Sequence, residues 1–161
     1  MKEEVAKKLV EAARSGKYKQ TRGCLRNTTK VVEAGIDVGE ERSCFCILGI
    51  LCDLFANEHS FAYWERSTFF GRPTPEMLFV LDGTDSDQKV EKCALESSLP
   101  RTVVEWAGLK SQDGRFEVTN DMVDDLPGQL GMTEALMNLN DDYYWDLHRI
   151  ADFVEKHWMH I

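Results

Sequence analysis

Apolar residues recur at helical spacing close to the beginning of the chain. Val5, Leu9, Ala12 and Ala13 fall on one face of a helix, with lysine and glutamate residues between them. The Ser-Gly pair at 15–16 is typical of a helix end. The pattern therefore predicts an amphipathic helix that begins near residue 3.

A second amphipathic pattern lies near the end of the chain. Its apolar stripe consists of Leu147, Ile150, Ala151 and Val154. Asp146 precedes this stripe and is a favourable N-cap, because its carboxylate accepts a hydrogen bond from a free amide of the first turn. We therefore predict a helix over residues 147–158.

The longest apolar run covers residues 44–52 and is interrupted only by Gly49. A buried helix and a buried strand both fit so uniform a run, since periodicity does not separate them. The length of the run, extended to Ala56, favours the helix. Ser43 is then the expected N-cap of a buried central helix that starts near Cys44.

The other predicted elements are short. Proline at the first turn and glycine after the last turn indicate a helix over residues 100–107. Apolar positions indicate another helix over 132–139. Alternation over 115–119 and an apolar run over 77–81 suit strands, and a short hairpin fits within residues 17–42.

Residues 57–98 are aromatic-rich in their first part and contain Pro73 and Pro75. We expect an insertion or an irregular excursion there, because proline interrupts both helices and central strands. The elements together predict a mainly α fold, or α+β with a small β component. The expected organisation is a single compact domain over residues 1–161, built around the buried central helix.

Composition excludes some classes of protein. The net charge of −9 argues against binding to the phosphate backbone of nucleic acids. No segment has the roughly 20 consecutive apolar residues of a membrane span. The charged N-terminus does not resemble a signal peptide, and five cysteines without an export signal suit reduced thiols in the cytoplasm.

Cys46 is the candidate nucleophile. With Ser43 as N-cap it would lie in the first helical turn, where free amides and the helix dipole stabilise a thiolate. A nucleophilic cysteine also needs a histidine as general base, and the spacing selects none of His59, His148, His157 and His160. The alternative is a buried core thiol, which the apolar neighbours favour.

We expect neither a metal site nor a cofactor. Cys44 and Cys46 lie on different sides of the predicted helix, and no second cysteine pair has zinc-site spacing. The acidic stretch 82–87 lacks the order of a calcium loop and is expected to form turns. P-loop, dinucleotide-binding, nucleophile-elbow and metalloprotease motifs are absent from the sequence.

Several segments carry a resemblance to a known family. They are SGKYKQ at 15–20, CILGILCDL at 46–54, LP and EWAGL within 99–109, LND at 139–141 and IADFVE at 150–155. In this order they resemble a family of small uncharacterised phage, prophage and bacterial proteins. Ile47 departs from that pattern, which usually has a second cysteine. The resemblance implies a setting, in phage or prophage genes, and no activity.

The recurrent segments contain Gln20, Cys46, Asn140 and Asp141. Glutamine, cysteine and asparagine are also polar groups of papain-like thiol enzymes, so Cys46, Asn140 and Asp141 are candidate catalytic residues. No histidine lies in these segments, however. The alternative is that Asn140 and Asp141 pin the last helix and that Gln20 satisfies backbone groups.

We expect an accessory protein that binds a host protein or a small ligand in the cytoplasm, and we lean against an enzyme. One alternative is a cysteine-dependent hydrolase or transferase that uses Cys46. Another is a nucleotide-sequestering anti-defence protein with a basic or aromatic pocket near Arg22, Arg26 or Trp64. Gln20, Arg22 and Trp64 are the candidate ligand-binding residues, and the sequence does not indicate an oligomeric state.

Overall fold

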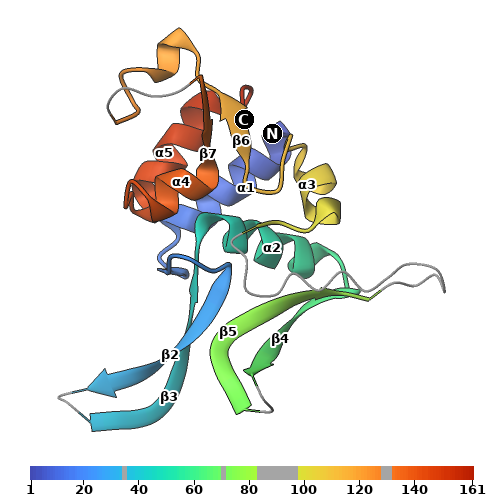
Figure 1. Ribbon diagram of the computed structural model, residues 1–161, viewed down its shortest axis with the longest axis vertical. Coiled ribbons are helices and arrows are strands. Elements are labelled where there is room, and N and C mark those ends of the chain that lie inside the picture. Colours follow the sequence, from blue (N-terminus) through green and yellow to red (C-terminus); the bar gives the residue numbers. More distant parts are fainter. Residues whose placement is uncertain (34–35, 70–71, 83–97, 128–131) are drawn as a thin grey trace.

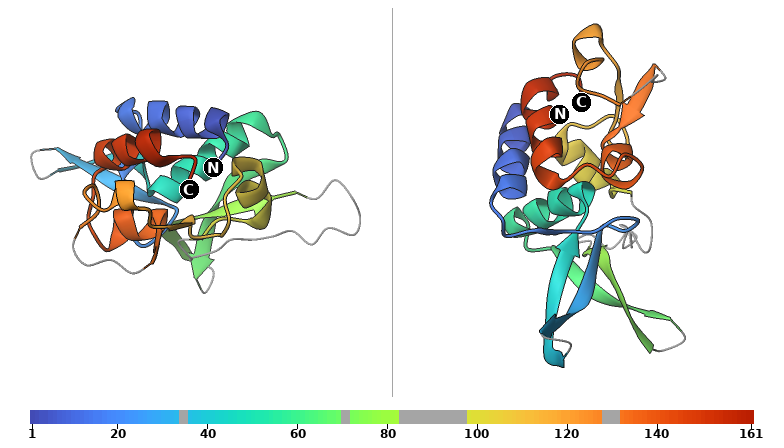
Figure 2. Two further views of the ribbon diagram at one scale, coloured as in Figure 1. Left: turned by 90° about the horizontal axis from the view of Figure 1, so that it is seen from above. Right: turned by 90° about the vertical axis from the view of Figure 1, so that its left-hand side faces the viewer.

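A computed structural model describes residues 1–33, 36–69, 72–82, 98–127 and 132–161. Its helices form a body at one end, and two β-hairpins project from the same side of that body (Figures 1 and 2). Within the described residues, no helix is long and apolar enough to cross a membrane.

The two predicted terminal helices are confirmed. Helix α1 covers Glu3–Arg14 and helix α5 covers Leu147–His157, and the two lie side by side in the body (Figure 2). Their apolar faces are buried, and the Asp146 carboxylate accepts a 2.8 Å hydrogen bond from the Arg149 amide as the N-cap of α5. The body therefore follows from the amphipathic patterns at both ends of the chain.

The central helix α2 covers Ile47–Glu58 and lies between the body and the hairpins (Figure 1). The predicted helix is confirmed, but its predicted start near Cys44 and its predicted N-cap, Ser43, are wrong. Both residues belong to a strand, and Cys46 is the N-cap: its Sγ accepts a hydrogen bond from the Gly49 amide at 3.3 Å. The start was mispredicted because the apolar run includes the last residues of that strand, which leads almost directly into the buried helix.

The larger sheet has five strands in the order β1-β3-β2-β5-β4. Their bounds are β1 Lys19–Gln20, β2 Arg26–Glu33, β3 Ile36–Phe45, β4 Ala62–Phe69 and β5 Arg72–Leu81. Strands β2 and β3 form the short hairpin predicted within 17–42, although it is longer than expected. Strands β4 and β5 form a second antiparallel hairpin within residues 57–98.

The two hairpins are joined at their base and diverge away from it (Figure 1). Asn27 of β2 pairs with Glu76 of β5, and this is the single β2–β5 residue pair among the described residues. Glu41 of β3 nevertheless forms an ion pair with Arg66 of β4, although β2 and β5 separate these strands in the sheet. The sheet is therefore curled, with the ion pair on its concave side.

The remaining elements belong to the helical body on the side of α2 away from the hairpins, and α3 and α4 among them pack on α2 (Figure 1). They are α3 Arg101–Ala107, β6 Arg115–Glu117, the 3-10 helix η1 Asn120–Met122, β7 Thr133–Ala135 and α4 Leu136–Asp141. The helix predicted over 132–139 is thus a short strand followed by a short helix. The acidic stretch 82–87 lies outside the described residues except for Asp82.

The predicted mainly α fold is wrong. The described residues form seven strands in two sheets together with five α-helices, so the protein is α+β. The missing part of the prediction is the pair of hairpins. Their strands carry charged residues and prolines that hide the alternation of a half-buried strand.

Candidate functional site

Cys46, the candidate nucleophile, is buried. Its side chain is 2% exposed, and burial raises the pKa of its thiol to about 12. The four histidines all lie in the described part of the chain, and none of them hydrogen-bonds to Cys46. A thiol in these surroundings stays protonated at neutral pH, and a protonated thiol is a poor nucleophile.

The two histidines with side-chain partners belong to other parts of the molecule. His59 stacks on Phe55 of α2 with ring centroids 4.0 Å apart. His157 is buried on α5, where its Nε2 lies 2.7 Å from the Asp125 carboxylate. The structure therefore does not bring a general base to Cys46.

The structure brings Gln20 and Asn140 together. Asn140 is 1% exposed, and its Oδ1 accepts a 2.9 Å hydrogen bond from the Gln20 amide. Its Nδ2 donates to the Thr21 carbonyl at 3.0 Å and to the Asp141 carboxylate. Gln20 also donates to the Trp145 carbonyl at 2.7 Å. Both polar atoms of the Asn140 side chain therefore have hydrogen-bond partners in the protein. A buried polar side chain needs such partners, and here they join two distant segments of the chain.

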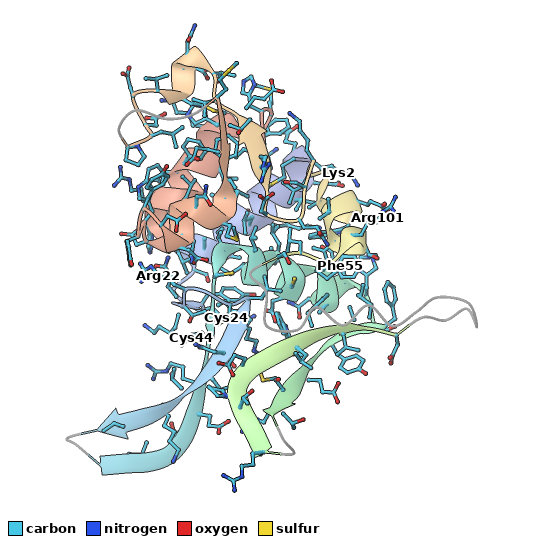
Figure 3. All side chains as sticks on the ribbon, viewed as in Figure 1. Lys2, Arg22, Cys24, Cys44, Phe55 and Arg101 are labelled. Atoms are coloured by element: carbon cyan, nitrogen blue, oxygen red, sulfur yellow. The ribbon has the colours of Figure 1, made fainter. Side chains whose placement is uncertain are left out.

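Arg22 and Asp141 extend this network to the surface. Arg22 Nε donates to the Asn140 carbonyl at 3.0 Å, and its guanidinium lies over the Tyr144 ring with its Cζ 5.0 Å from the ring centroid. Asp141 accepts a hydrogen bond from the Gly23 amide. Figure 3 shows Arg22 where the segment before β2 meets the helical body. Four of the candidate residues thus connect the segment around 20–23 to the segment around 140–145.

Trp64, the remaining candidate, lies elsewhere and contacts a different set of groups. Its indole Nε1 donates to Asp53 Oδ1 at 3.1 Å, and Tyr18 donates to Asp53 Oδ2 at 2.7 Å. Burial and the bond to Asp53 raise the pKa of the Tyr18 hydroxyl. Asp53 is therefore a carboxylate on α2 that holds one aromatic residue from before β1 and one from β4.

Arg26 of β2 lies beside Trp64 on the concave side of the sheet. Its Cζ is 5.0 Å from the Phe45 ring centroid and 5.2 Å from the Trp64 centroid. One terminal nitrogen donates to Ser43 Oγ at 2.8 Å, whereas Nε is buried without a hydrogen-bond partner. Burial lowers the pKa of Arg26, and nearby Asp53 opposes this effect without forming an ion pair.

A cavity of about 500 Å³ opens beside this guanidinium. We call it the Arg26 pocket; its lining residues are Lys17, Tyr18, Arg26, Glu41, Arg42, Ser43, Phe45, Asp53 and Asn57. Its volume is in the range of roughly 300–1,000 Å³ that is usual for small-molecule sites. Aromatic walls with a few convergent polar groups are also typical of such sites.

The charges of the pocket are unevenly paired. The Glu41 carboxylate has Arg66 as its ion-pair partner, and Asp53 accepts the two hydrogen bonds described above. Among the described residues, Lys17, Arg26 and Arg42 have no carboxylate within ion-pair distance. The two donors to Asp53 are neutral, so this carboxylate keeps its charge; three cations without an ion-pair partner therefore face one such carboxylate, and the pocket is net positive in a chain whose net charge is −9.

The second large cavity lies between α1 and α5 and has a volume of about 450 Å³. Its two cations are already paired: Arg14 contacts both Asp152 and Glu155, and Lys7 contacts Glu3. A third cavity, of about 280 Å³, has three carboxylates in its lining against two cations. Neither has the unpaired positive charge of the Arg26 pocket.

The described residues contain no group of three or more histidine, cysteine, aspartate or glutamate side chains arranged to hold a metal ion. Cys24 and Cys44 do approach each other near the base of the β2–β3 hairpin (Figure 3). Cys24 is half-buried, and burial raises the pKa of its thiol. Cys44 lies 3.6 Å from the Thr29 hydroxyl.

The sequence predicted a basic or aromatic pocket near Arg22, Arg26 or Trp64; the structure places Arg26 beside Trp64, whereas Arg22 contacts Asn140 and Tyr144 instead. The sequence prediction missed Tyr18, Phe45 and Asp53. One signal for Asp53 was present in the sequence, since it is a carboxylate one residue after a run of apolar helix positions. A charge so close to a buried helix face needs partners, and those partners form the pocket wall.

Comparison with known proteins identifies a family for this chain, but it finds no similar curated protein or solved structure. No curated protein and no solved structure matches the chain at a significant level. The sequence model of one family matches residues 1–158, which is nearly the whole chain. The protein therefore belongs to the family described as Domain of unknown function (DUF8296).

Proposed function

We propose that this protein binds a small anionic ligand in the Arg26 pocket and acts through that binding. One observation carries the proposal: a half-buried guanidinium faces a cavity with most of its hydrogen-bonding capacity unused. Among the described residues, Ser43 Oγ is its single side-chain acceptor. A guanidinium has five N–H donors, and burying them without acceptors is costly.

The charge distribution of the pocket supports an anion as the ligand. Lys17 and Arg42 are exposed, and Arg26 lies deeper between aromatic rings. An anion that enters meets three cations that have no ion-pair partner among the described residues and that outnumber the one unpaired carboxylate, Asp53, whereas the rest of this acidic surface repels it. The pocket thus concentrates anionic ligands locally in a chain of opposite overall charge.

Binding without covalent chemistry also agrees with the surroundings of Cys46. The thiol is buried and protonated, and both polar atoms of the Asn140 side chain are hydrogen-bonded to protein groups. The resemblance to phage and prophage proteins supplies the setting of the proposal, an accessory protein acting in the cytoplasm of a host cell. A host protein as partner stays a prediction.

Isothermal titration calorimetry with a panel of anions tests the proposal. The panel contains inorganic phosphate, pyrophosphate, citrate and the nucleoside mono- and triphosphates. Arg26→Gln is expected to lower the affinity about 10- to 100-fold, because a hydrogen bond to a charged group contributes about 1.5–3 kcal/mol. Circular dichroism and thermal unfolding show whether the variant remains folded.

Arg101→Gln is the matched control. Arg101 is an exposed arginine on α3 that pairs with Glu105 and lies outside the pocket (Figure 3). Its replacement removes the same charge and is expected to change the affinity less than twofold. The proposal fails if no anion of the panel binds, or if a folded Arg26→Gln protein binds as tightly as the wild type.

A further inference from the structure

The Arg26 pocket contains two opposite charges that do not touch. Arg26 and Asp53 both line it, and these two side chains form no ion pair with each other, although Asp53 lies near enough to raise the pKa of Arg26 against the effect of burial. Arg26 belongs to β2 and Asp53 to α2, so the packing of a strand against a helix sets the gap between them. A charge pair held apart in this way is complementary to a ligand that carries both signs of charge.

Both charged groups keep free hydrogen-bonding positions. Asp53 Oδ2 accepts from the Tyr18 hydroxyl at 2.7 Å, and Oδ1 accepts from the Trp64 indole at 3.1 Å. An ionised carboxylate has about four lone-pair positions, so about two remain, and neither donor carries a charge that would neutralise it. A guanidinium has five N–H donors, and among the described residues Arg26 finds one side-chain acceptor, Ser43 Oγ at 2.8 Å. Each group therefore retains its charge and room for a charged partner.

The chemistry of an α-amino acid matches this pair of groups. Its ammonium has three N–H donors and its carboxylate has only acceptors, and both groups are attached to one carbon atom. The carboxylate suits the guanidinium, because hydrogen bonds between two ionised groups are about twice as strong as neutral ones. The Ser43 hydroxyl, which accepts from Arg26, can donate its own hydrogen to the same carboxylate. The ammonium suits the free positions of Asp53 for the same reason.

The excess of cations in the pocket favours one class of amino acid. Lys17 and Arg42 also line the pocket and are exposed, and neither has an ion-pair partner in the part of the chain that the structure describes. A neutral zwitterion brings one charge of each sign and leaves this excess unchanged. A second carboxylate on the ligand reduces it, so the field of the whole pocket favours an amino acid with an acidic side chain.

We infer that the ligand of the Arg26 pocket is an acidic α-amino acid. Its α-carboxylate binds the Arg26 guanidinium and the Ser43 hydroxyl, and its α-ammonium binds Asp53. Its side-chain carboxylate supplies the second negative charge that the excess of cations favours. This inference rests on the proposed anion-binding function, and it adds the chemical class of the ligand and the partners of its two α-groups.

Matched ligands test the inference on the unaltered protein by titration calorimetry. L-Glutamate is compared with N-acetyl-L-glutamate and glutarate, which lack the ammonium, with γ-aminobutyrate, which lacks the α-carboxylate, and with L-glutamine, which lacks the side-chain charge. L-Aspartate is compared with the corresponding set. For the tighter of the two amino acids, we expect at least about tenfold weaker binding when either α-group is missing, because each makes a charge-assisted hydrogen bond. The amide analogue should bind about three- to tenfold more weakly, since its lost charge acts at longer range.

Two variants locate the ammonium. Asp53→Asn keeps the shape of the side chain and removes its charge, so it is expected to reduce the preference for the amino acid over its N-acetyl form to within about twofold. Asp142→Asn is the matched control, because Asp142 is exposed and does not line the pocket, and it should leave the preference at the wild-type value. Asp53 also holds Tyr18 and Trp64, so the Asp53 variant must unfold cooperatively; if it does not fold, the ligand series on the wild-type protein decides.

The outcomes separate this inference from the function on which it rests. If the N-acetyl and deamino analogues bind as tightly as the amino acids and their binding depends on Arg26, the amino-acid inference is overturned and anion binding stands. The same holds if neither amino acid binds while another anion does. If L-glutamine binds as tightly as L-glutamate, and L-asparagine as tightly as L-aspartate, the acidic class is overturned. If no ligand of either set binds, both proposals fall.

Discussion

Replacing Gly49 by alanine should destabilise this protein strongly, although alanine is the better helix former. Gly49 lies in the first turns of α2, where the helix meets the chain just before β2. An alanine Cβ at this position would lie 1.8 Å from the Leu25 carbonyl oxygen and 2.6 Å from its carbon. Both are backbone atoms, so no side-chain rotation relieves the contact.

The size of the effect follows from this geometry. Helix and carbonyl must separate by at least 1.2 Å, from 1.8 Å to the 3.0 Å below which real Cβ contacts essentially never occur. The same carbonyl accepts a 3.1 Å hydrogen bond from the Cys46 amide, which the movement breaks. Overpacking costs about 1–3 kcal/mol and an unpaired buried amide about 1–3 kcal/mol. Helix propensity returns about 1 kcal/mol, which leaves a loss of about 3 kcal/mol.

Urea denaturation followed by circular dichroism measures this loss, and the midpoint of thermal unfolding should fall by about 6–12 °C for a chain of this length. Gly16→Ala is the matched control. Gly16 has a φ of 72° and open space around its Cβ position, so alanine there costs about 1–2 kcal/mol through the backbone alone. Wild-type or greater stability of Gly49→Ala would refute the close approach of α2 to Leu25.

Two further predictions concern ionisable groups. At pH 7.5 a thiol with a pKa of about 12 is roughly a thousandfold less ionised than an ordinary cysteine. Alkylation mapped by mass spectrometry should therefore be far slower at Cys46 than at half-buried Cys24. Faster labelling of Cys46 would restore the nucleophile hypothesis. Hydrogen bonds from Lys156 and His157 lower the pKa of Asp125 in the folded state, so their stabilising effect is present at neutral pH and is lost as the pH falls through that lowered pKa. Asp125→Asn should therefore reduce stability at pH 7 and lessen the further loss between pH 6 and 3, whereas Asp124→Asn should do neither; equal acid profiles for the two variants would contradict the assignment.

Helices α1 and α5 were predictable because each buries one continuous apolar stripe that is read within a few turns. The β4–β5 hairpin was not, and Pro73 and Pro75 explain why. Proline normally argues against a strand inside a sheet, since it has no N–H to donate. Here β5 forms a ladder pair with β2 only at Glu76 among the described residues, and the contact of β2 with Pro75 goes through the Pro75 carbonyl, which accepts a 3.2 Å hydrogen bond from the Thr28 hydroxyl, so no N–H of a proline is needed on that side. A divergence of two hairpins is a tertiary feature that leaves no local pattern.

The candidate site shows the same limit. Gln20 and Asn140 are 120 residues apart in the sequence, and both lie in segments that resemble a known family. That resemblance suggested that the two residues act together. The structure shows a hydrogen bond between their side chains. The Arg26 pocket draws instead on β2, β3 and α2, with Trp64 of β4 behind it. The spacing of these residues along the chain does not predict that they line one pocket, because their proximity depends on how strongly the sheet curls. The sequence offered two signals for it, the hypothesis of a basic or aromatic pocket near Arg22, Arg26 or Trp64 and the charge of Asp53 next to an apolar helix face.

Helix α2 connects the fold of this protein to its pocket. Gly49 and Asp53 are four residues apart and lie on the same side of the helix. At Gly49 the helix contacts Leu25, the residue that precedes Arg26, and at Asp53 it reaches the pocket that Arg26 lines. The close approach at glycine therefore sets how far the Arg26 guanidinium stands from the Asp53 carboxylate. An apolar segment that looks purely structural in the sequence thus also fixes the spacing of the two charges with which the pocket would recognise its ligand.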